Sequence, residues 1–162
     1  MSIGPIMIRH MPNRRSYGAK KNYEADAIQC VEDGNPSEIT DAAFVLAHFK
    51  DDMSQAETER IGKWVFHVAE KYIDDTWQNV KRAVEAGKLW KFAKASTAWR
   101  SKGGVYVLLV YTHDSGDEKD VMRIRAYLRE MGFKRRAPYK TDAQTRAGIY
   151  SDNSDGVAKY FA

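Results

Sequence analysis

The chain has 162 residues, of which 43% are hydrophobic and 30% charged, and its formal net charge is +4. This size and balance are typical of one folded domain and exclude a disordered or fibrous protein. No stretch approaches the roughly 18 consecutive apolar residues of a membrane span, which argues against insertion in a bilayer. The single cysteine, Cys30, cannot form an internal disulfide, which favours a reducing compartment and a cytoplasmic location.

Charge is distributed unevenly along the chain. Residues 1–23 contain five Arg or Lys residues and no acid, whereas residues 24–59 contain ten acids. Basic clusters follow at residues 88–102 and 123–146. Such asymmetry is typical of a protein with an anionic partner. The alternative is a set of solvated surfaces that balance one another.

The N-terminal residues differ in composition from the rest of the chain. Residues 1–22 combine Pro, Gly, Arg and Asn without an apolar period, which predicts a flexible basic tail. An organellar leader is the alternative, because such leaders are rich in Arg and poor in acids. Residues 23–162 show no repeat or low-complexity block, so they are predicted to form a single α+β domain.

The first predicted elements are a turn and a helix. The run Asp33-Gly34-Asn35-Pro36 favours a turn. Ser37 or Thr40 is placed to cap a following helix, which would carry the apolar residues of 42–47 and end by residues 51–52.

A strand and a longer helix come next. Residues 63–68 alternate between apolar and polar side chains, as a half-buried strand does. Apolar residues then recur at helical spacing from Ile73 to Val84. Gly87 suits the left-handed position that often follows a helix.

The second half of the chain is dominated by predicted strands. Residues 92–97 form one strand, and residues 105–112 form a central strand covered on both faces. Asp117 is a suitable N-cap for a second long helix, which ends at Gly132. Short strands are predicted at residues 139–141, 148–150 and 157–161. This order predicts an α+β fold with helices packed on one face of a sheet.

Several of these segments resemble the translation initiation factor 4E family, which binds the mRNA cap. The matching stretches are Gly62-Lys63-Trp64, the helix around Trp77, Arg100-Ser101-Lys102-Gly103, the strand 105–112, the helix 117–132, and residues 139–148. A closer resemblance, to the basophilic leukaemia expressed protein family, rests on Gly62-Lys63-Trp64, on Tyr111-Thr112-His113-Asp114 and on Tyr139-Lys140-Thr141-Asp142 through Thr145-Arg146-Ala147-Gly148. That family shares the initiation-factor fold and has no established activity. The resemblance implies a curved, mainly antiparallel sheet with helices on one face.

The resemblance also implies where a ligand would bind. The initiation factor holds the methylated guanine between two tryptophans of its first half, whereas this sequence has no tryptophan before Trp64. Tyr111 falls about where the family has a tryptophan near the methyl group of the cap. Arg100 and Lys102 match the turn that contacts the cap phosphates. The expected ligand is therefore a nucleotide, an RNA or another phosphorylated molecule.

A second basic segment is expected to complete the site. Lys140 and Arg146 lie with Asp142 and Thr145 in one polar stretch. If this stretch and the basic turn line one groove, they form an anion-binding surface; the alternative is a solvated loop. The predicted ligand-binding residues are Arg100, Lys102, Tyr111, His113, Lys140 and Arg146.

Two other functions remain open from the sequence. His113, at the end of the central strand, is the one candidate for acid–base catalysis in an enzyme acting on a phosphorylated substrate, a hydrolase or a lyase. However, a His-Asp pair before a turn is often a capping arrangement. The third possibility is a protein-interaction module that uses the acidic residues 24–59.

The tryptophans and metal-binding residue types complete the prediction. Trp64 and Trp77 lie on apolar periods and are predicted to be core residues. Trp90 and Trp99 are flanked by Lys and Arg and are predicted to be exposed, where they could stack on bases. No histidine has metal-ligand spacing with Cys30 or with another histidine, and no Gly-rich phosphate loop is present, so no metal and no cofactor are expected.

Overall fold

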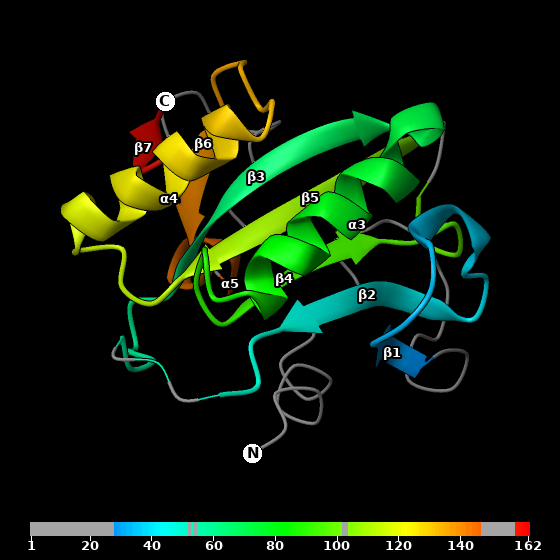
Figure 1. Cartoon of the computed structure of the whole chain (residues 1–162), viewed down its shortest axis with the longest axis horizontal. Helices are drawn as coiled ribbons and strands as arrows, with labels where there is room; N and C mark the ends of the chain where they lie inside the picture. Colours follow the sequence, from blue (N-terminus) through cyan, green and yellow to red (C-terminus); the bar gives the residue numbers. More distant parts are fainter. Residues whose placement is uncertain (1–27, 52, 54, 102–103, 147–157) are drawn as a thin grey trace.

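The computed structural model describes residues 28–51, 53, 55–101, 104–146 and 158–162. The seven strands in this part of the chain form one open sheet in the order β1-β2-β4-β5-β3-β6-β7 (Figure 1). Their bounds are β1 (Ile28–Val31), β2 (Ala42–His48), β3 (Gly62–Ala69), β4 (Phe92–Ser96), β5 (Val105–Thr112), β6 (Pro138–Thr141) and β7 (Tyr160–Phe161). Every neighbouring pair is antiparallel except β1 and β2. The predicted mainly antiparallel sheet is confirmed.

Two long helices, α3 (Glu70–Glu85) and α4 (Glu118–Glu130), lie on the same side of this sheet (Figure 1). The short η2 (Pro36–Glu38) and α5 (Asp142–Arg146) complete the described helices. The predicted α+β class, with its helices on one face, is therefore confirmed. Within the described residues, no helix has both the length and the apolar character that a membrane span requires.

Helix α3 forms because one of its faces is apolar. Ile73, Trp77, Val80 and Val84 recur at helical spacing and are completely buried. The helix ends before Gly87, whose φ of 73° lies in the left-handed region that favours glycine. The helix and its terminator agree with the prediction.

Helix α4 begins at the predicted cap. The Asp117 side chain accepts a hydrogen bond from the backbone N–H of Asp120 at 3.2 Å, which satisfies one of the free donors of the first turn. Val121, Ile124 and Leu128 form its buried stripe.

The core lies between the helices and the face of the sheet that carries Trp64, Leu108 and Val110. The Trp64 indole N–H donates to the backbone oxygen of Val121 at 3.1 Å, which joins β3 to α4. Gly62 lies next to the buried Tyr139 ring, and a Cβ at Gly62 would overlap the ring carbons and the hydroxyl. Dense packing on this face therefore requires glycine at one strand position.

The central position of β5 is confirmed, but its predicted burial on both faces is only partly correct. Val105 is 47% exposed, and Val107 and Leu109 are half-buried. Because α3 and α4 lie on one side only, the odd-numbered side chains of β5 have no helix above them.

The predicted helix after residue 37 is wrong. Residues 42–48 form strand β2, and six of its seven residues are buried. Such a strand lacks the alternation that distinguishes strands from helices, because both of its faces are covered. Strand β1, which pairs with it in parallel, was not predicted.

Some predicted segments fall outside the described residues. These are the basic tail 1–22 and the strand 148–150. The predicted last strand, 157–161, is described as a strand only at Tyr160–Phe161. The single-domain boundary at residue 23 stays a prediction.

Candidate functional site

The face of the sheet turned away from α3 and α4 carries three lysines on three strands, and we call it the lysine face. Lys63 on β3 is opposite Lys140 on β6, and on its other side it is opposite Tyr111 on β5. Lys94 on β4 is opposite Leu109, two residues from Tyr111. Residues paired across antiparallel strands share a face, so these side chains form one row across four strands.

The lysines of this row are buried. Lys63, Lys94 and Lys140 are only 4%, 5% and 6% exposed. Lysine is almost never buried to this extent unless its charge is compensated, because the loss of hydration is costly. The ammonium of Lys63 forms an ion pair with the Asp142 carboxylate at 2.6 Å, at the start of α5.

The cations of the row act on one another. The pKa of Lys94 is lowered to about 8, mainly by burial and in part by the positive charges of Lys63 and Arg100, while Cys30 and Asp142 act in the opposite direction. The rings beside Lys94 are shared with two of these cations, because Arg100 also lies over Phe44 and Lys63 also lies over Tyr111. A negative charge bound between the cations would relieve the repulsion that lowers this pKa.

Aromatic rings lie beside the cations. The Lys94 ammonium is 4.3 Å and the Arg100 guanidinium carbon 4.6 Å from the centroid of the Phe44 ring. Lys63 and Lys94 each lie 5.9 Å from the centroid of the Tyr111 ring. At these distances the rings stabilise the positive charges electrostatically.

The structure brings together three of the six predicted ligand-binding residues, namely Arg100, Tyr111 and Lys140. Lys102 lies outside the described residues, and Arg146 is described only as the last backbone position of α5. Lys63 and Lys94 were not among the predicted ligand-binding residues. Both lysines interrupt apolar strands, but only the strand register shows that their side chains share the face turned away from α3 and α4.

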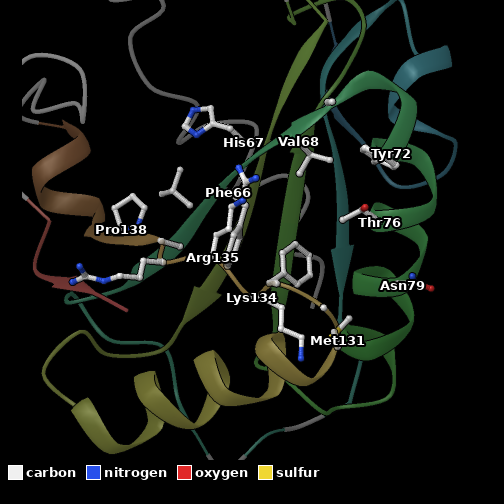
Figure 2. Close-up of a pocket in the computed structure, with 16 residues that line it drawn as sticks. Phe66, His67, Val68, Tyr72, Thr76, Asn79, Met131, Lys134, Arg135 and Pro138 are labelled. Carbon is white, nitrogen blue, oxygen red and sulfur yellow. The ribbon is translucent and has the colours of Figure 1, made fainter.

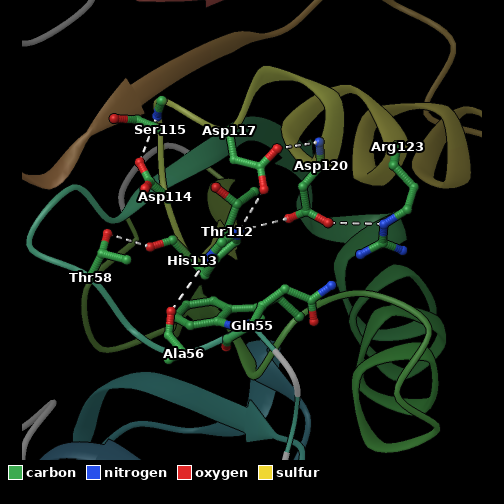
Figure 3. A network of polar contacts seen from close by, with 12 residues as sticks. Gln55, Ala56, Thr58, Thr112, His113, Asp114, Ser115, Asp117, Asp120 and Arg123 are labelled. Carbon is green, nitrogen blue, oxygen red and sulfur yellow. Dashed lines mark hydrogen bonds and ion pairs between the residues drawn. The ribbon is translucent and has the colours of Figure 1, made fainter.

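His113 lies elsewhere, in a polar network at the end of β5 (Figure 3). Its Nε2 is 3.0 Å from an oxygen of Asp117 and 3.8 Å from one of Asp120, both at the start of α4. Its Nδ1 is 3.3 Å from the backbone oxygen of Ala56. None of the described contacts of His113 involves the lysine row, so these contacts favour a structural role.

Asp114 forms the other half of this network. Arg60 donates two hydrogen bonds to its carboxylate, at 2.8 and 2.5 Å, and the backbone N–H of Gly116 donates a third at 2.8 Å. The hydrogen bond from Arg60 is the main reason that the pKa of Asp114 falls to about 2. The His-Asp pair thus closes the turn between β5 and α4.

The prediction that Trp90 is exposed is wrong. Its side chain is completely buried, and its indole N–H donates to the backbone oxygen of Gln55 at 2.9 Å. The ring packs against Phe92 and His113, with centroids 5.1 and 6.3 Å away. Trp99 is half-buried, and the predicted core positions of Trp64 and Trp77 are confirmed.

Metal-ligating residue types do not converge in the described part of the chain. No group of three or more His, Cys, Asp or Glu side chains there is arranged to hold a metal ion. The chemistry available on the lysine face is therefore that of amines, a guanidinium, a phenol and one carboxylate.

Comparison with known proteins assigns the chain to a family. The model of the basophilic leukemia-expressed protein Bles03 matches residues 46–148. The chain belongs to the Bles03 family. The match includes Lys63, Lys94, Arg100, Tyr111 and Lys140, so the lysine face lies within the part that defines membership in the Bles03 family.

A solved structure is similar in fold. It is the crystal structure of schistosome eIF4E complexed with m7GpppA and 4E-BP, with a TM-score of 0.52 and 14% sequence identity. The match covers 65% of this chain and 61% of that chain. At this identity the likeness shows the fold, and the predicted initiation factor 4E-like fold of this Bles03 family member is confirmed.

Proposed function

We propose that the lysine face binds a phosphorylated ligand of the nucleotide class, either a free nucleotide or the end of an RNA. The observation that carries the proposal is the row of Lys94, Lys63 and Lys140 around the Tyr111 ring. Amines from three strands offer several donors to phosphate oxygens, and aromatic rings offer a surface to a base. The initiation factor neighbour, whose crystal structure is a complex with m7GpppA, supports this class of ligand.

The described aromatic rings of the lysine face are not arranged as two parallel rings that could hold a base between them. Tyr111 packs on Phe92 with centroids 4.6 Å apart, and Phe44 already contacts two cations. We therefore expect contacts with the phosphates to contribute more to the binding free energy than stacking of the base does. We expect a modest preference among bases and a strong dependence on the number of phosphates.

Burial has a consequence for binding. The three lysines are less than a tenth exposed, so a ligand reaches them only if the face opens. We expect association to be slower than diffusion and to be accompanied by a change in hydrogen exchange on β3, β4 and β6.

The test is a calorimetric titration at low salt with GTP, m7GTP, ADP, inorganic phosphate and a short single-stranded RNA. Binding should weaken at least tenfold in Lys94→Met and in Lys140→Met, and it should weaken steeply with added salt. The control is Lys71→Met, because Lys71 is an exposed residue of α3. Absence of binding to all of these ligands at low salt contradicts the proposal, as does equal binding by Lys94→Met and the control.

One variant distinguishes the proposed binding function from the alternative, an enzyme that uses His113. His113→Ala removes the imidazole from the turn and leaves the lysine row unchanged, so we expect ligand binding to persist. Turnover of a phosphorylated substrate that disappears in His113→Ala would instead support the enzyme.

A further inference from the structure

Half of strand β3 is an unpaired edge among the described residues. β6 pairs with β3 only from Gly62 to Trp64, whereas β5 pairs with it along all eight residues. On the β6 side, Val65–Ala69 therefore extends beyond the last paired residue.

Proline explains why the pairing stops. The register places Pro138 opposite Val65, and proline has no N–H to donate to the next ladder position. The other edge of β6 continues its pairing with the C-terminus, where Ala137 and Ala162 exchange two backbone hydrogen bonds, at 2.8 and 3.1 Å.

The hydrogen-bond pattern shows which groups point outward. The carbonyl of Ile61 accepts from the N–H of Asp142, on the β6 side, and the N–H of Glu70 donates to Gly104, on the β5 side. Because backbone groups alternate along a strand, odd-numbered residues of β3 point to the edge. The N–H and C=O groups of His67 and Ala69 thus face outward, and both residues are exposed.

A groove runs along this edge (Figure 2). Its volume is about 700 Å³, and its walls come from β3, from α3 and from the segment 131–138 that follows α4. Tyr72, Thr76 and Asn79 line the α3 side, and Phe66 and Phe133 pack together on the floor with centroids 4.6 Å apart. An apolar floor beside free backbone donors and acceptors is the arrangement that accepts an added strand.

Apart from His67, the groove's ionisable charges are all positive. Lys134, Arg135 and Arg136 line it and are exposed, and no acid is among the described residues that line it. Their loop is held in place by Arg125, whose guanidinium donates to the backbone oxygens of Phe133 and Arg135 at 2.9 and 2.6 Å. A positively charged wall held in a fixed position selects negatively charged ligands.

We propose that the free half of β3 is a docking site for an extended acidic peptide of a partner protein, which adds as a strand beside Val65–Ala69. Its backbone pairs with His67 and Ala69. Its alternate side chains enter the groove, where carboxylates meet Lys134 and Arg135. A second copy of this chain fits less well. A twofold interface places the same surface of both copies together, so the two basic loops would lie in one interface and repel each other.

The probe is a fluorescein-labelled ten-residue peptide in which Glu alternates with Val or Thr. We expect saturable binding by anisotropy, and at least a tenfold loss when Lys replaces every Glu or when alternate backbone nitrogens are methylated. The double variant Lys134→Glu with Arg135→Glu should weaken binding at least tenfold. A charge-matched control, Lys50→Glu with Lys88→Glu, changes two exposed lysines outside the groove and should bind normally.

Hydrogen exchange provides an independent readout. In the free chain the amides of His67 and Ala69 should exchange rapidly, while those of Phe66 and Val68, which face β5, should be protected. Adding the peptide should protect His67 and Ala69. His67→Pro removes one outward N–H and should abolish binding; if that variant fails to fold, the methylated peptide makes the same test on the ligand.

Four outcomes overturn the proposal. They are no binding of the acidic peptide, equal binding of the methylated peptide, protection of both outward amides in the free chain, and a concentration-dependent dimer that protects them. The experiment is separate from the nucleotide test, because Lys134 and Arg135 lie in the loop after α4, outside the lysine row, and the methylated peptide changes only the ligand.

Discussion

Both faces of the sheet carry buried side chains, but their chemistry is opposite. On the helix face, Trp64, Leu108 and Val110 pack against two helices, and their burial is favourable in itself. On the lysine face, Lys63, Lys94 and Lys140 are buried at a cost, which ion pairing and aromatic contacts only offset. The difference indicates that the first face stabilises the fold, whereas the second is maintained for another purpose. Nucleotide binding is the purpose we propose.

The largest effect should come from the helix face. Trp64→Ala removes a completely buried indole and leaves a cavity between β3 and α4, so the free energy of unfolding should fall by about 3–5 kcal/mol. Urea denaturation measures the change. Lys94→Met, on the other face, should be nearly neutral at pH 7, because replacing a buried charge by an apolar side chain is often neutral or stabilising. A loss in Lys94→Met as large as that in Trp64→Ala would remove the distinction between the faces.

The second effect is a pH dependence specific to the lysine face. The pKa of Lys94 is about 8 in the folded chain against 10.5 unfolded, so between these values only the unfolded state keeps the proton. Stability should therefore rise with pH across this window, by on the order of 3 kcal/mol for this residue alone. The contribution of Lys94 is obtained by subtracting the unfolding free energy of Lys94→Met from that of the unchanged chain at each pH. The tyrosines titrate in both proteins, so their contribution cancels. A flat difference curve would show that Lys94 is not buried as a charge.

A smaller effect should follow from crowding the helix face. Gly62→Ala places a Cβ against the buried Tyr139 ring, and such overpacking costs about 1–3 kcal/mol. In a Tyr139→Leu background the same substitution should cost clearly less, as measured by a double-mutant cycle of unfolding free energies. Equal costs in both backgrounds would place the strain elsewhere.

The smallest effect should come from the turn that joins β5 to α4, which belongs to neither face. Asp114→Asn removes the negative charge and one of the two oxygens that accept from Arg60, and it should cost about 1 kcal/mol at pH 7. Because the pKa of Asp114 is lowered to about 2, its contribution exists above the unfolded value and is lost as pH falls from about 4 towards 2. The control is Asp75→Asn, an exposed residue of α3. The difference in unfolding free energy between this control and Asp114→Asn should shrink towards zero as pH falls from about 4 to 2. Ligand binding should be unchanged in both variants.

The helices and strands that could be predicted from the sequence are those with one apolar side and one polar side. In α3, α4 and β3 one side is apolar and the other polar, so the period is visible. In β2, the run from Ala42 to Ala47 is buried throughout, and its alanines and leucine fit a helix equally well. Local pattern could not decide between the two, because the cover over β2 comes from distant parts of the chain.

The candidate site was predicted in part for a related reason. Arg100, Tyr111 and Lys140 were found through their resemblance to a known family, whereas Lys63 and Lys94 belong to no motif of the ligand site. Their places follow from strand register, which sequence alone does not give. Trp90 was misplaced because neighbouring lysines suggested solvent, although the ring itself turns into the core.

The parallel pair at the edge of the sheet has a consequence for how the chain assembles. Parallel neighbours need a crossover, and the one between β1 and β2 contains only η2 and its flanking turns. This crossover is fastened to α3, because Ser37 donates to Asp74 through its backbone N–H at 2.9 Å and Gln78 donates to Asn35 at 3.1 Å. We therefore expect strand β1 to pair late during folding, after α3 has docked, and to separate early on heating.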